Sequence, residues 1–79
     1  MTMKSLDEFV ELFQEQFDDT EGIEASTVFH DLDEYSSLVA LSIIAMIDEE
    51  FDVTVKGEDM QAAVTVEDLY NRVVEKLNN

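Results

Sequence analysis

The chain has 79 residues, of which 46% are hydrophobic, so we expect a small folded protein and not a disordered one. Twenty acidic residues against four basic ones give a net charge of −16. That charge excludes ordinary nucleic-acid binding, which needs lysine and arginine against the phosphates, and it excludes attraction to anionic membranes. It favours partners with basic protein surfaces. The chain has no cysteine, so it has neither a disulfide framework nor a thiolate metal site.

A first helix is predicted over residues 5–17. Ser5 and Glu8 form a capping-box pattern at its start. Its apolar residues share one face at helical spacing: Leu6, Phe9, Val10, Phe13 and Phe17. No apolar secretion signal precedes it, and the apolar run 38–47 is too short to span a bilayer, so we expect a cytoplasmic protein.

Residues 18–35 show no sustained period and are expected to form a long loop. Four of its apolar side chains are predicted to pin it to the core: Ile23, Val28, Phe29 and Leu32.

A second helix is predicted over residues 37–51. A helical wheel places five side chains towards the core: Leu41, Ile43, Ile44, Ile47 and Phe51. It places five others on the opposite side: Leu38, Val39, Ser42, Met46 and Glu49. An apolar stripe left at the surface is a candidate docking site. The alternative is a central helix that is buried all round.

Residues 53–55 are expected to be an extended loop, and residues 58–62 a short helical turn. Thr65 is expected to cap a last helix. That helix places six apolar or aromatic residues on one face: Val66, Leu69, Tyr70, Val73, Val74 and Leu77. The sequence therefore predicts an all-α fold, a small bundle of three main helices plus one short helix, with residues 1–79 as a single domain.

Two serines meet at the start of the second helix. A serine in this position is usually only a cap. Here Ser36 can cap the helix, which leaves Ser37 at the first helical position with its hydroxyl pointing outwards. The free N–H groups and the dipole at a helix start favour a phosphate.

Ser36-Ser37-Leu38, the apolar helix after it and its acidic exit around Phe51 resemble the acyl carrier protein family, whose motif is Asp-Ser-Leu. Upstream, Phe29-His30-Asp31-Leu32 is similar to the family's Phe-x-x-Asp-Leu, one residue shorter. The stretch from Leu32 to Ser37 is one residue longer than in the fatty-acid type. The resemblance covers nearly the whole chain.

The resemblance implies a non-enzymatic acyl carrier protein with 4′-phosphopantetheine attached to Ser37. Acyl or aminoacyl intermediates would be held on it as thioesters and delivered to partner enzymes. The implied partners are a phosphopantetheinyl transferase and acyl-processing enzymes with basic surfaces. We expect the protein itself to be a monomer. We expect docking at Leu38, Val39, Met46, Glu49 and Glu50. Fatty acid, polyketide, amino acid and surface-polysaccharide pathways all use such carriers.

Ser36 stands where the family motif has aspartate. Serine can still cap the helix, but a carboxylate that would contact a basic modifying enzyme is lost. The main alternative is therefore an unmodified acidic helical module for protein interaction. A calcium-binding EF-hand starting at Asp31 fails, because Ser36 and Ser42 stand where glycine and glutamate are required; we expect no metal site. A hydrolytic triad with His30 and Ser37 lacks the Gly-x-Ser-x-Gly elbow, and His30 is expected to be a loop residue.

Overall fold

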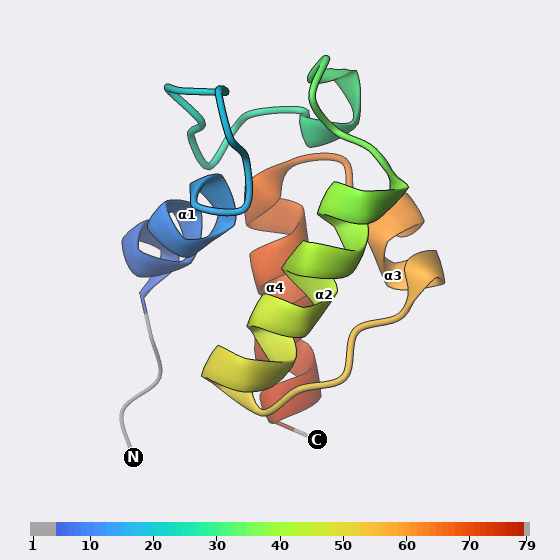
Figure 1. The fold of residues 1–79 in the computed structure, drawn as a ribbon. Helices are drawn as coiled ribbons and strands as arrows, with labels where there is room; N and C mark the ends of the chain where they lie inside the picture. The colour runs from blue at the N-terminus through green and yellow to red at the C-terminus, as the bar shows by residue number, and fades with distance from the viewer. Residues whose placement is uncertain (1–4, 79) are drawn as a thin grey trace.

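A computed structural model describes residues 5–78 of the chain. Its elements, in chain order, are α1 (Leu6–Gln14), the 3₁₀ turn η1 (Phe29–Asp31), α2 (Ser37–Phe51), α3 (Gly57–Ala62) and α4 (Val66–Leu77). Figure 1 shows α2 lying across α4, with α1 and α3 on opposite sides of them. The described residues contain no strand, only an isolated bridge between Val28 and Thr65. The prediction of three main helices and one short one is confirmed.

The helix starts follow the predicted caps. The Ser5 hydroxyl accepts from the Glu8 N–H at 3.2 Å, and the Glu8 carboxylate accepts from the Ser5 N–H at 3.2 Å, which completes the capping box. Thr65 caps α4 by accepting from the Asp68 N–H at 3.1 Å. The predicted end of the first helix at residue 17 is wrong. After Gln14 the N–H of Phe17 bonds to the carbonyl of Gln14, so a tighter turn replaces the last helical turn.

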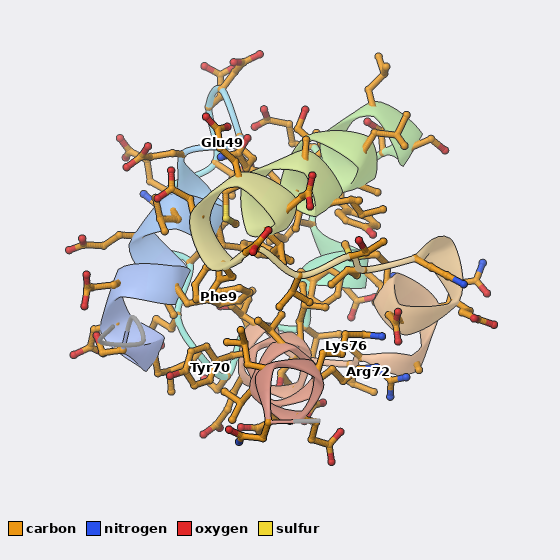
Figure 2. All side chains as sticks on the ribbon, turned by 90° about the horizontal axis from the view of Figure 1, so that it is seen from below. Phe9, Glu49, Tyr70, Arg72 and Lys76 are labelled. Atoms are coloured by element: carbon orange, nitrogen blue, oxygen red, sulfur yellow. The ribbon has the colours of Figure 1, made fainter. Side chains whose placement is uncertain are left out.

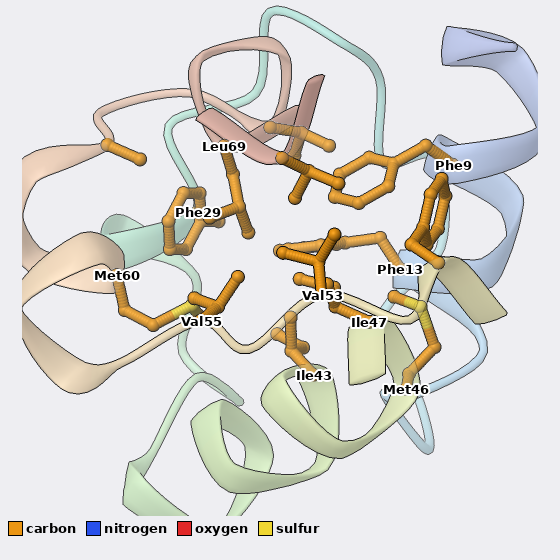
Figure 3. Packing of buried hydrophobic residues seen from close by; sticks show 14 of the residues in the cluster. Phe9, Phe13, Phe29, Ile43, Met46, Ile47, Val53, Val55, Met60 and Leu69 are labelled. Carbon is orange, nitrogen blue, oxygen red and sulfur yellow. The ribbon is translucent and has the colours of Figure 1, made fainter. Parts of the chain in front are cut away.

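The core lies where α1, α2 and α4 meet, and phenylalanines fill much of it (Figure 3). Phe9 packs edge-on against Phe51, with ring centroids 5.6 Å apart, and Phe13 packs edge-on against Phe29 at 5.3 Å. Aromatic pairs favour such tilted geometries. Phe9 and Phe13 from α1 thereby join α2 and the long loop in one apolar cluster.

The rotation of α2 about its axis differs from the predicted wheel. Ile43, Ile47 and Phe51 are buried as predicted. Met46, however, is only 6% exposed, and Leu41 is 61% exposed, so the expected sides of these two residues are wrong. The cause is α1, which packs on α2 and brings Leu12 beside Met46. α3 packs on α4 and leaves Leu41 uncovered. Burial all round is also wrong, because Leu38 is 78% exposed.

The long loop is held partly by its side chains and partly by its backbone. Ile23 and Phe29 are buried and Leu32 packs against the core, as predicted, but the expected burial of Val28 is wrong, since it is 39% exposed. Backbone contacts fix this part of the loop instead. The carbonyls of Thr27 and Ala25 accept from the N–H groups of Val66 and Glu67, at 3.1 and 2.9 Å. They satisfy N–H groups of the first turn of α4 that have no partner inside the helix.

The segment after α2 matches its predicted form. Residues 53–55 are extended without forming a strand, and Val53 and Val55 are buried. The last helix buries Val66, Leu69 and Val73, as its apolar face predicts, but Leu77 at its end is exposed. No helix among residues 5–78 has both the length and the apolar character needed to cross a membrane.

Glu34 ties the two ends of the long loop together. Its carboxylate accepts from the N–H groups of Asp18, Asp19 and Thr20 and from the Thr20 hydroxyl, the last at 2.8 Å. The backbone hydrogen bonds from Asp18 and Asp19, which favour the ionised form, hold the pKa of Glu34 below its ordinary value. The segment that leads into α2 therefore depends on an ionised carboxylate.

Because the folded-state pKa of Glu34 is depressed, its contribution to stability is present above the unfolded pKa and is lost as pH falls through the folded pKa. We expect Glu34→Gln to lower the melting temperature at neutral pH, with a gap to the unsubstituted protein that closes as the pH falls through the folded-state pKa of Glu34. Asp33→Asn is the matched control, since it removes the same charge from a neighbouring exposed residue. Equal effects of both substitutions at every pH would contradict this role of Glu34.

Candidate functional site

The two serines at the start of α2 have different roles, as the sequence predicts. Ser36 has the extended backbone of an N-cap, and its hydroxyl accepts from the Val39 N–H at 3.3 Å. Ser37 is the first residue of α2 and is exposed. Its hydroxyl makes no hydrogen bond to any of residues 5–78. One serine therefore stabilises the helix, and the next one presents a free hydroxyl.

The surroundings of the Ser37 hydroxyl favour an anion. The first residue to make a helical backbone hydrogen bond is Ala40, whose N–H donates to the Ser36 carbonyl at 2.8 Å. The N–H groups of Ser37 and Leu38 have no acceptor within the described part of the chain. The first turn of α2 contains no acidic residue, although the chain is acidic overall. A phosphate joined to Ser37 would thus meet unpaired N–H groups and the positive end of the helix dipole.

A groove of about 410 Å³ opens beside Ser37, between the first half of α2 and α3. Its α2 side is formed by Ser37, Ala40, Leu41 and Ile44, and its α3 side by Gly57, Met60 and Gln61. His30, Tyr35 and Ser36 line the remaining edge. The groove therefore starts at the free hydroxyl and has mainly apolar side chains along its α2 wall.

His30 lies at the edge of this groove and reaches α3, although the sequence indicated only a loop residue. Its Nε2 is 2.8 Å from the Met60 carbonyl oxygen and 3.0 Å from that of Ala63. Because both partners accept only, Nε2 must carry the proton and donate. The ring also stacks on Phe29, with centroids 4.4 Å apart. No local pattern reveals these contacts, since the partners are 30 and 33 residues away in sequence.

Asp59 attaches α3 to α4. It is 5% exposed and accepts from Arg72 at 2.8 Å, with Lys76 at 3.4 Å from its other oxygen. That second oxygen also accepts from the Lys56 N–H at 3.0 Å and closes the first turn of α3. The Lys56 N–H, and then Arg72, lower the pKa of Asp59 against the effect of burial. Arg72 and Lys76 lie together on α4, among many outward-pointing carboxylates (Figure 2).

The exposed face of α2 changes character along its length. Near Ser37 it presents Leu38 and Leu41, and near its end Asp48, Glu49 and Glu50 are exposed. Val39, expected on this face, is half-buried and packs against the core. Met46 is buried, and it is one of the residues that line a groove between the end of α1 and α2. The sequence did not predict Leu41 as a surface residue, because the rotation of α2 is set by its packing against α1.

The rival chemistries gain no support from the arrangement of the residues. No group of three or more histidine, cysteine or carboxylate side chains within residues 5–78 is placed to hold a metal ion. His30 directs its Nε2 proton to carbonyl oxygens of the α3 segment and not to Ser37. A histidine and serine acting as base and nucleophile must hydrogen-bond to each other.

A family model described as "Phosphopantetheine attachment site" matches residues 7–73. No curated protein and no solved structure matches the chain significantly. Because the family match spans most of the sequence, the chain belongs to the phosphopantetheine attachment-site family. Such domains are carriers without catalytic activity, and their cofactor is covalently attached 4′-phosphopantetheine.

The residues at the start of α2 fit this group. The attachment needs a free hydroxyl, room around it and donors for a phosphate, and the start of α2 supplies all three. When bound, the group brings a terminal thiol to a chain that has no cysteine of its own.

The assignment of Ser36 as the helix cap can be tested by measuring the free energy of unfolding. Ser36→Ala should lower the free energy of unfolding by about 1 kcal/mol, the usual cost of losing an N-cap. Ser37→Ala should leave it nearly unchanged, and Ser36→Asp, which restores an acceptor, should recover the loss. Urea denaturation of the three variants measures this. A larger loss for Ser37→Ala than for Ser36→Ala would show that the cap is misassigned.

Proposed function

We propose that Ser37 is the residue that carries 4′-phosphopantetheine, and that the chain holds acyl or aminoacyl groups on it for delivery to partner enzymes. The observation that carries the proposal is the exposed hydroxyl of Ser37 at the first position of α2, left free because Ser36 caps the helix. A tethered group reaches a partner's active site at a high effective concentration once the carrier docks. The carrier therefore contributes position and recognition.

The exposed face of α2 is our proposed docking surface: Leu38, Leu41, Asp48, Glu49 and Glu50. Its leucines adjoin Ser37 and offer apolar area, while its carboxylates attract arginine and lysine on a partner and speed encounter. Carboxylates at the end of a helix oppose its dipole, so folding alone does not favour them there. Met46 is left out because it is buried, and Val39 contributes only its exposed part. The proposed partners are a phosphopantetheinyl transferase and acyl-processing enzymes with basic surfaces.

Modification at Ser37 predicts a specific pattern of mass changes. After incubation with coenzyme A and a promiscuous phosphopantetheinyl transferase, the unsubstituted protein and Ser36→Ala should gain one phosphopantetheine, and Ser37→Ala should gain none. Intact-mass spectrometry gives the result. Absence of any gain in the unsubstituted protein would favour the unmodified interaction module instead.

Docking through the α2 face predicts a charge effect on the rate of that transfer. Glu49→Lys combined with Glu50→Lys should slow transfer, mainly through the association rate and most at low salt. Glu11→Lys combined with Glu24→Lys is the matched control, with the same change in net charge on exposed residues of α1 and the long loop. Leu41→Ala should slow transfer at all salt concentrations. Equal rates for the two charge-reversed proteins would contradict the acidic part of the docking surface.

A further inference from the structure

The α3 wall of the groove is intrinsically weak. α3 has only six residues, and isolated helices of that length are not stable in water. It begins at a glycine, and within it only Asp59 and Met60 are buried. α3 packs on α4. The position of this wall therefore depends on a few specific contacts at its two ends.

The amino end of α3 is attached to α4. Asp59 is held by Arg72 and Lys76 and also closes the first turn through the Lys56 N–H. Buried, charge-assisted hydrogen bonds of this kind are the stronger class. Beyond the other end of α3, Thr65 and Val66 anchor the chain at the start of α4.

The carboxyl end of α3 is held by His30. The last carbonyls of a helix have no partner inside it. The Met60 carbonyl is one of these, because the Val64 N–H that would continue the helix donates to Asp68 instead, at 3.2 Å. His30 supplies the missing donor to Met60 and to Ala63 just beyond the helix, through one N–H shared between two oxygens. The His30 ring is itself fixed between Phe29 and Tyr35, with Tyr35 edge-on at 5.2 Å.

We propose that His30 is the positioning residue of the groove: it clamps the carboxyl end of α3, while the Asp59 contacts act as the fixed end about which α3 moves when the clamp opens. Opening breaks the shared His30 hydrogen bond, frees the Ala63 N–H from the Asp59 carbonyl and loosens the packing of the buried Met60 and Ala63 side chains. The charge-assisted contacts of Asp59 stay intact. It moves Met60 and Gln61, two of the three residues on the α3 side of the groove. In the carrier proposed above, on which this role rests, His30 thus sets the width of the groove that adjoins the Ser37 attachment.

Amide hydrogen exchange on the unmodified protein tests the clamp, with two amides of the α3 segment and one of α4 as reporters. His30→Phe keeps an aromatic ring between Phe29 and Tyr35 and removes the donor. The Ala63 amide, which donates to the Asp59 carbonyl at 3.1 Å, should then exchange about fivefold faster, the change expected from losing one typical hydrogen bond. The Asp59 amide at the fixed end and the Leu69 amide in α4 should change little.

His30→Gln, which returns an N–H donor on a side chain of similar reach, should restore most of the protection at Ala63. If the exchange rates of the Ala63, Asp59 and Leu69 amides all rise together in His30→Phe, His30 supports the core in general and the proposal is overturned. An unchanged exchange rate at Ala63 overturns it as well. If His30→Phe does not fold, restored folding without restored protection in His30→Gln overturns it equally. Because the experiment uses protein without the cofactor, its failure is separate from failure of the carrier function, which the mass measurement tests independently.

Discussion

The rotation of α2 about its own axis determines which of its side chains fill the core and which face the solvent. Ile43, Met46 and Ile47 are buried in the core that this helix shares with α1 and α4, and Phe51 meets Phe9 at its end. Each fully buried side chain of this size contributes on the order of 2 kcal/mol, so a different rotation would cost several such contributions. With this face fixed, Ser37, Leu38 and Leu41 must point outwards. The proposed attachment site and the proposed docking surface are thus consequences of how the apolar core is filled.

The second constraint is the shortage of cations. Four basic residues cannot neutralise twenty acidic ones, and two of the four, Arg72 and Lys76, converge on one buried carboxylate. Other carboxylates use the backbone. Glu8, Glu34 and Asp68 each accept backbone N–H groups at a helix start or at a loop end. The hydrogen bond from the Thr65 backbone likewise holds the pKa of Asp68 below its usual value. The acidic residues therefore define helix starts and loop closure, while most of the remaining negative charge faces solvent.

Local signals in the sequence predicted what depends on local structure. Ser5, Ser36 and Thr65 marked three helix starts, because capping needs only residues within one turn. The same reasoning placed Ser37 at the first position of α2. Long-range packing decided the rest. α2 is apolar on nearly every side, so its periodicity did not specify which side α1 covers, and Met46 and Leu41 were interchanged. Neither the exposed Val28 nor the contact of His30 with α3 has any local signature.

The carrier role depends most directly on the identity of the modified residue. Fragment-ion mass spectrometry of a peptide containing residues 36–37, taken from protein treated with coenzyme A and a phosphopantetheinyl transferase, locates the added group on a single side chain. The structure predicts phosphopantetheine on Ser37, whose hydroxyl is free, with Ser36 unmodified because its hydroxyl caps α2. Phosphopantetheine on Ser36, or none on either serine, would contradict it.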